Sequence, residues 1–328
     1  MLSGFLISGL LFREYQRRGS LALPRFWVRR GLRIYPAFCV LLLCTWLAFR
    51  YFRVPRTSGT ALLAEVFFLQ NYLGGMWNHT WSLAVEEHFY LALPLLLLAL
   101  ARIGRTKRDP FRAVVPLGAA VMLGLAVLRC INAWQLPYTH GTHLYPTHLR
   151  FDSLLAGVLL AYAYQFHRPD FDRLVTPRRR FLCFAGTACF LPAFLFGLET
   201  AWFVPTLGLT LFACGSVLLI AAGHGVTPPL PARLLAPMGV HSYSTYLWHM
   251  PMVIWGLPIC EHLLQAALDP GVRIVIYLVG SLVVGAAMNR IAEEPLLRLR
   301  DRWFPSQAEG RTQVLHLPDR RKELKRSA

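Results

Sequence analysis

Two arginines three residues apart lie in the segment RRGLRIYP, at residues 29–36. On a helix this spacing places Arg30 and Arg33 on one face, where their guanidinium groups can together hold a phosphate or diphosphate. The alternative is that both arginines anchor a membrane helix and reach toward lipid headgroups, which is the commoner role at a helix end. Spacing alone favours the anchor, so the phosphate site is a hypothesis at this point.

A second polar cluster, HTWSLAVEEHFYLALP at residues 79–94, leads into a long apolar run. Glu86 and Glu87 fall within its first turns, and carboxylates inside a membrane helix are costly and tend to mark function. The milder interpretation is that a carboxylate near a helix N-terminus gains from the helix dipole. Adjacent helical residues point about 100° apart, so both cannot serve one site equally. We favour Glu86 as the inward-facing carboxylate and a candidate for catalysis.

Three histidines follow in the segment YTHGTHLYPTHLRFDS, at residues 138–153. Their spacing, interrupted by glycine and proline, fits no metal-ligand template even with Asp152 added, so we predict no metal site. A polar rim that hydrogen-bonds a sugar suits the segment better, and a plain exposed loop is the alternative. Arg150 and Asp152 lie at the edge of the next apolar run, where a local ion pair would ease their burial.

The last cluster, HSYSTYLWHMP at residues 241–251, carries His249 within apolar surroundings. Burial favours a neutral imidazole, which can accept a proton or a hydrogen bond. A structural histidine bonded to a neighbouring helix is the commoner role. We retain His249 as a second candidate for catalysis.

The composition indicates the environment in which these polar clusters lie. Of 328 residues, 55% are hydrophobic and 16% charged, and the net charge is +17; the mean hydropathy is +0.43. A soluble domain of this length is less apolar. The basic residues gather in short loops between apolar runs, which favours a membrane protein and excludes nucleic acid as the partner. The seven cysteines form no ligand or CxxC spacing and are typical of small core residues.

The apolar runs predict an all-α, polytopic integral membrane bundle with about nine of about ten expected spans present, since a span needs roughly 20 apolar residues. Residues 1–12 form a shorter stretch that matches the later part of a helix. The segment 61–70 is too short and predicts an interfacial or re-entrant turn. The full spans are predicted at 33–52, 82–101, 113–133, 149–166, 181–198, 203–222, 240–260 and 272–292.

The loops alternate in charge. Basic loops at 13–30, 102–112 and 167–180, with the basic C-terminal segment, alternate with poorly basic loops. The positive-inside rule places the basic loops and the C-terminus in the cytoplasm and Met1 outside. One further preceding helix with a cytoplasmic N-terminus would complete this pattern. We expect a membrane domain at 1–300 and a basic, disordered cytoplasmic tail at 301–328.

Six motifs occur in a recognisable order over about the first 300 residues. They are LSGFLI, RRGLRIYP, NYL followed by WSLAVEEHFYLALPLL, HLRFDSLLAGVLLA, SYSTYLWHMP and AEEPLLRLRDR. In this order they resemble the acyltransferase-3 (OafA/YrhL-like) family of membrane acyltransferases. The resemblance implies acyl-CoA as a cytoplasmic co-substrate, with no other cofactor. It also implies a carbohydrate or other hydroxyl acceptor on the outer side.

The resemblance transfers roles to matching positions. The family's paired-arginine motif falls on Arg30 and Arg33, and its Ser-Leu-x-x-Glu motif runs from Ser82 to Glu86. His88 stands where the family commonly has glutamine. The family's first helix, with the histidine thought to be catalytic, would precede LSGFLI. The candidates are Arg30, Arg33 and Tyr35 for the donor, Glu86 and His249 for catalysis, and Trp81, Ser82, His148 and Asp152 for the acceptor.

The sequence thus predicts an O-acyltransferase, most simply an acetyltransferase, in the inner membrane of a bacterium. A transporter or flippase is one alternative, since intramembrane polar groups also suit transport, but it predicts a repeat of broken helices that the sequence lacks. A catalytically silent, truncated family member is the other. An upstream extension of the reading frame would discriminate between that alternative and an active enzyme.

Overall fold

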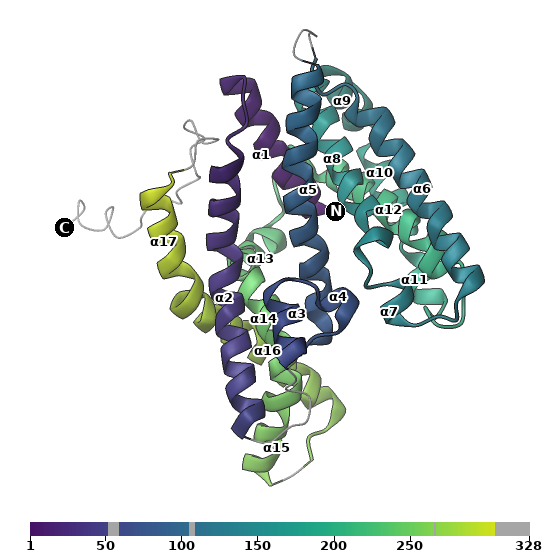
Figure 1. The fold of residues 1–328 in the computed structure, drawn as a ribbon. Helices are drawn as coiled ribbons and strands as arrows, with labels where there is room; N and C mark the ends of the chain where they lie inside the picture. Colours follow the sequence, from purple (N-terminus) through teal and green to yellow (C-terminus); the bar gives the residue numbers. More distant parts are fainter. Residues whose placement is uncertain (52–58, 105–108, 266, 306–328) are drawn as a thin grey trace, which may run out of the picture.

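The computed structural model describes residues 1–51, 59–104, 109–265 and 267–305, and every regular element within these ranges is helical (Figure 1). The predicted all-α class is confirmed. The expected boundary at residue 300 falls inside the last helix, α17 (Glu294–Trp303). Most of the expected tail, residues 306–328, lies outside the described residues.

Five predicted spans coincide with helices long and apolar enough to cross a membrane. The chain is therefore a multi-pass membrane protein, as predicted. The five are α2 (Leu23–Tyr51), α5 with its preceding turn (Asn78–Ile103), α6 (Val114–Gln135), α12 with its preceding turn (Val204–Gly223) and the continuous stretch Pro270–Trp303 that contains α16 (Pro270–Met288) and α17. The α5 helix proper is Trp81–Ile103 and α12 is Leu209–Gly223.

The three other predicted spans are shorter or interrupted. The span at 149–166 corresponds to α8 (Phe151–Phe166), which has 16 residues. The span at 181–198 divides into α10 (Arg179–Ala188) and α11 (Leu191–Leu195). The span at 240–260 begins at the end of α13 (Leu230–Val240) and continues as α14 (Ser242–Pro251), a π turn and α15 (Leu257–Leu264). Pro192 lies at the start of α11 and Pro251 lies directly before the π turn. Proline lacks a backbone N–H donor and favours interruption at these two breaks.

The short apolar segment at 61–70 forms a turn, as predicted, and not a span. It consists of α3 (Gly59–Val66) and α4 (Gln70–Leu73), with a reversal at Phe68, whose φ is 56°. Glu65 is fully buried there and accepts hydrogen bonds from the Trp77 N–H at 3.1 Å and the Thr80 hydroxyl at 3.0 Å. These bonds tie the turn to the start of α5.

The first helix, α1 (Leu2–Arg18), is longer than the predicted stretch and ends on Gly19, whose φ of 68° suits a helix C-cap. It packs closely on α8 through glycines. A Cβ on Gly4 would lie 2.1 Å from the Leu154 carbonyl oxygen, and one on Gly157 would lie 2.3 Å from that of Met1. Small residues permit such backbone approach between membrane helices. The packing fixes where α1 lies.

The helices form two groups with α1 and α5 between them (Figure 1). One group contains α6, α8, α10 and α12, and the other contains α2, α14, α16 and α17. Buried side chains such as Phe12, Phe38, Leu97 and Leu247 join α1, α2, α5 and α14 in one apolar core. Polar residues of these same four helices meet beside that core.

Candidate active site

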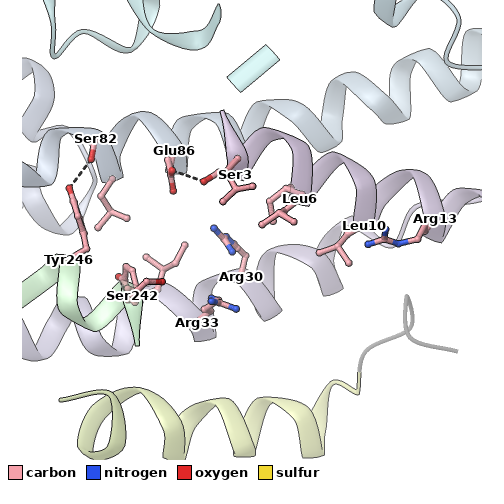
Figure 2. A pocket seen from close by; sticks show the side chains of 15 residues that line it. Ser3, Leu6, Leu10, Arg13, Arg30, Arg33, Ser82, Glu86, Ser242 and Tyr246 are labelled. Carbon is pink, nitrogen blue, oxygen red and sulfur yellow. Dashed lines mark hydrogen bonds between the residues drawn. The ribbon is translucent and has the colours of Figure 1, made fainter. Parts of the chain in front are cut away.

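A cavity of about 510 Å³ lies where α1, α2, α5 and α14 meet (Figure 2). Its lining combines apolar side chains with cationic, acidic and hydroxyl groups, which a ligand of mixed chemistry requires. The polar residues that carry the argument below are Arg13, Arg30, Arg33, Ser82, Glu86 and Tyr246.

Arginines form one side of the cavity. The i, i+3 spacing on α2 turns Arg30 and Arg33 to the same face, and both line the cavity together with Arg13 from α1. The guanidinium carbon of Arg30 lies 4.0 Å from the centre of the Tyr90 ring, a cation–π contact that orients it. Within the described ranges, none of these three arginines forms an ion pair with a carboxylate. Their donors can therefore serve an anionic ligand.

Glu86 faces these arginines from α5 and is held in place by two hydroxyls. Ser3 donates a hydrogen bond to Oε1 at 2.7 Å, and Tyr90 donates one to Oε2 at 2.8 Å. Glu87, in contrast, is buried against a separate, smaller cavity. The helical angle between adjacent residues thus separates the two carboxylates as predicted, and Glu86 lines the larger cavity.

Ser82 lies one helical turn before Glu86 and also lines the cavity. Its Oγ lies 2.7 Å from the Tyr246 hydroxyl, which in turn donates to the backbone carbonyl of His79. Figure 2 shows Ser82 and Tyr246 at one end of the cavity, Glu86 and Arg30 in the middle, and Arg13 at the other end. The Ser3 hydroxyl lies beside Glu86, so hydroxyl groups occur in the middle of the cavity as well as at the Ser82 end (Figure 2).

Two predicted residues lie outside this cavity. Tyr35 lines a neighbouring cavity of about 220 Å³ that it shares with Arg30 and Glu87. The ring of His249 lies 4.9 Å, centre to centre, from that of His79, and its Nδ1 contacts the Tyr246 carbonyl at 2.5 Å. His249 therefore supports the helix that carries Tyr246, and it does not contact the cavity.

The remaining acceptor candidates also lie elsewhere. Trp81 stacks on Tyr145 with ring centres 5.2 Å apart, and exposed His148 contacts the Tyr72 hydroxyl through Nδ1 at 3.0 Å. Asp152 is 1% exposed. Its ion-pair partner is Arg129 at 2.8 Å and not Arg150, the neighbour that sequence proximity suggests. Asp152 therefore stabilises the packing of α8 on α6 and does not line the cavity.

Sequence reasoning missed several lining residues, among them Ser3, Arg13, Tyr243 and Tyr246. Arg13 falls in the segment predicted as a basic loop, but α1 continues past it to Arg18. A signal for the tyrosines was present, because Tyr243 and Tyr246 are three apart in the same motif as His249 and so share a helix face. Ser3 had no signal, since its role depends on α1 meeting α5.

Comparison with known proteins independently supports the resemblance to acyltransferases. A family model described as an acyltransferase domain matches residues 1–290. The peptidoglycan O-acetyltransferase OatA of Listeria monocytogenes is 27% identical over 90% of this chain and 50% of its own length. The O-acetyltransferase OatA of Staphylococcus aureus is 26% identical over 78% of this chain and 45% of its own length.

A putative O-acetyltransferase of Staphylococcus aureus strain COL is 28% identical over 77% of this chain and 44% of its own length. This chain thus spans about half the length of the curated relatives that it matches. No solved structure matches it. Five of the six motifs lie within the matched residues, which cover most of the chain, and AEEPLLRLRDR follows just after them. The chain therefore belongs to the acyltransferase-3 family of acyltransferases.

Proposed function

We propose that the chain is a membrane O-acyltransferase that moves an acyl group, most simply acetyl, from acyl-CoA to a hydroxyl of a carbohydrate outside the cytoplasm. The observation that carries this proposal is the cavity itself. One side presents guanidinium groups without carboxylate partners among the described residues, and the other presents Ser82 and Glu86.

The guanidinium groups suit the phosphates of coenzyme A. Arginine binds phosphate through two parallel hydrogen bonds, and a low-dielectric cavity strengthens such contacts. Arg13 lies near the C-terminal end of α1, at the start of the basic segment 13–30 that the positive-inside rule assigns to the cytoplasm. A cytoplasmic donor would reach the cavity from that end. Family membership favours this role over transport.

The other end suits a sugar hydroxyl. In the proposed reaction the hydroxyl oxygen bonds to the acyl carbonyl carbon, the bond from that carbon to sulfur breaks, and the thiol leaves with the proton. Glu86 is the one carboxylate among the described lining residues, so we assign it to accept the hydrogen bond or proton of the attacking hydroxyl. Ser3 and Tyr90 hold its carboxylate in place for that task.

Further observations support the proposed acceptor class and the proposed orientation in the membrane. One relative is named a peptidoglycan O-acetyltransferase, which supports an aminosugar polymer as the acceptor class. The stacked pair of Trp81 and Tyr145 and the exposed His148 would form an outer rim that such a sugar meets first. Arg29 at the basic end of α2 pairs with Asp301 of α17 at 3.2 Å, so a cytoplasmic C-terminus would follow from the assigned orientation. We assign the chain to a bacterial inner membrane, which the bacterial relatives and the alternating charge of the loops support.

The test is transfer of label from radiolabelled acetyl-CoA to a chitooligosaccharide by the purified chain in proteoliposomes. Arg33→Ala removes a charge-assisted contact, so transfer at low donor concentration should fall by about tenfold or more. Arg29→Ala is the matched control, because Arg29 lies on the same helix and pairs with Asp301 outside the cavity. No transfer by the unmodified chain, or equal loss in both variants, would overturn the proposal.

A further inference from the structure

The hydroxyl of Tyr246 lies between two partners, the Ser82 Oγ at 2.7 Å and the backbone carbonyl oxygen of His79. A phenol carries one hydrogen, and a carbonyl oxygen can accept but cannot donate. The Tyr246 hydrogen therefore goes to the His79 carbonyl. In the contact with Ser82, the serine must be the donor and the phenol oxygen the acceptor.

This direction determines what Ser82 can offer a ligand. A serine hydroxyl has one hydrogen and two lone pairs, and here the hydrogen is committed to Tyr246. Ser82 lines the cavity, so it meets a ligand as an acceptor. The Glu86 carboxylate, one turn further along α5, is an acceptor as well, since its two oxygens receive hydrogen bonds from Ser3 and Tyr90.

The two sides of the cavity therefore have opposite hydrogen-bonding character. Ser82 and Glu86 accept hydrogen bonds, whereas the guanidinium groups of Arg30 and Arg33 only donate them. A ligand that fits must present a hydroxyl or similar donor to α5 and an anion or other acceptor to α2. An ether or a deoxy position opposite Ser82 would leave that acceptor unpaired, which is costly away from water.

We propose that Tyr246 is a positioning residue that holds Ser82 as a hydrogen-bond acceptor and thereby selects a hydroxyl donor at this end of the cavity. The inference rests on the proposed function, in which that donor is the sugar hydroxyl to be acylated. It adds a residue for which sequence reasoning assigned no role. A purely structural tyrosine would instead act through its ring, which packs on His79 with centres 5.4 Å apart.

A double-mutant cycle separates these roles. Ser82→Ala, Tyr246→Phe and the double variant are compared for transfer from acetyl-CoA to a chitooligosaccharide, with the KM of each substrate measured separately. Phenylalanine keeps the ring and its packing. Each single change should raise the KM for the oligosaccharide about threefold to tenfold, with the KM for acetyl-CoA unchanged. The double variant should be no worse than the worse single variant, because both remove the same contact.

Tyr243 provides the matched control. It lies on the same helix three residues earlier, lines the same cavity, and its hydroxyl donates a hydrogen bond to the Ile34 carbonyl at 2.8 Å. Among the described residues, the hydroxyl bonded to Ser82 is that of Tyr246 and not that of Tyr243. In a Tyr243→Phe background, Ser82→Ala should keep its full effect. In a Tyr246→Phe background that effect should vanish.

Multiplying losses in the double variant, or equal changes in both KM values, would overturn the inference while leaving the proposed function intact. Absence of any transfer by the unmodified chain would instead refute the proposed function. In that case, calorimetry measures binding of the same oligosaccharide to the full chain in detergent, for the unmodified chain and for the three variants of the cycle. Non-additive weakening by the two changes supports it, and additive weakening, no weakening or no binding to the unmodified chain overturns it.

Discussion

Arginines occur in two contrasting environments in this molecule. Arg129 of α6 is 2% exposed. It donates to the Thr206 carbonyl at 3.0 Å and the Leu149 carbonyl at 2.9 Å, contacts the Thr210 hydroxyl, and pairs with Asp152 at 2.8 Å. In the cavity, Arg30 and Arg33 have no carboxylate partner among the described residues.

This contrast distinguishes a structural arginine from one that can bind a ligand. Arg129 joins α6 to α8 and to the region around α12, and its contacts leave little for a ligand. Such a group stabilises the assembly because removing it would strand a buried charge. The cavity arginines can exchange water for a ligand, so their loss should affect binding far more than folding.

The greatest loss of stability is expected when the structural ion pair of Arg129 and Asp152 is disrupted. Arg129→Ala should lower the free energy of unfolding by about 3–5 kcal/mol, because Asp152 would remain buried without its partner. Thermal unfolding in detergent measures this. Replacing both residues together, as Arg129→Met with Asp152→Leu, should recover most of the loss. A stable Arg129→Ala variant that loses transfer would mean that Arg129 serves the ligand after all.

A second prediction concerns binding of the donor in the cavity. Arg13→Ala should raise the KM for acetyl-CoA about tenfold or more, because one charge-assisted phosphate contact is lost, with stability unchanged. Steady-state kinetics with acetyl-CoA and with S-acetylpantetheine checks this. The shorter donor lacks the nucleotide phosphates, so the variant should match the unmodified chain with it. Arg18→Ala, exposed at the end of α1, is the control and should change neither value.

A third prediction concerns the packing that brings α1 to the cavity. Gly157→Ala should lower the free energy of unfolding by about 1–3 kcal/mol, because the added Cβ meets backbone atoms of Met1 and Phe5. It should also reduce transfer, since α1 carries Ser3 and Arg13. Gly124→Ala is the control, as nothing lies within 4 Å of its added Cβ. Equal stability of the two variants in a thermal melt would argue against close packing of α1 on α8.

The smallest effect tests how Glu86 is held. Tyr90→Phe removes one of its two hydroxyl donors but keeps the ring beneath Arg30. The loss of one hydrogen bond predicts a decrease in kcat of about threefold to tenfold, with the KM for acetyl-CoA retained. Kinetics at saturating donor measure this decrease. A rise in the donor KM alone would show that Tyr90 acts through Arg30 and not through Glu86.

The cavity could be predicted in part from spacing within single helices. The i, i+3 pair on α2 and the Ser-Leu-x-x-Glu pattern on α5 each place side chains on one face, because the helical repeat is local. The partner of Asp152 could not be found this way. Arg150 is near in sequence, but Arg129 lies on another helix and reaches the carboxylate only through the packing of α6 on α8.

The same distinction holds for the helices. Five spans followed from apolar length alone, since a membrane demands a run of internally hydrogen-bonded residues. The interruptions after Ala188 and Pro251 could not be predicted in this way, because apolar composition does not report the local geometry that proline introduces. His249 was selected for its residue type, yet its helix instead directs Tyr243 and Tyr246 to the cavity.

The sequence by itself determined the membrane class, the family and which faces of α2 and α5 are polar, because hydropathy and periodicity are properties of contiguous residues. Tertiary structure alone decided which faces meet. Ser3 reaches Glu86 across 83 positions, and Ser82 reaches Tyr246 across 164. Such pairs depend on glycine-permitted packing of α1 on α8 and on the position of α14, so the chemistry of the cavity emerges only when four helices come together.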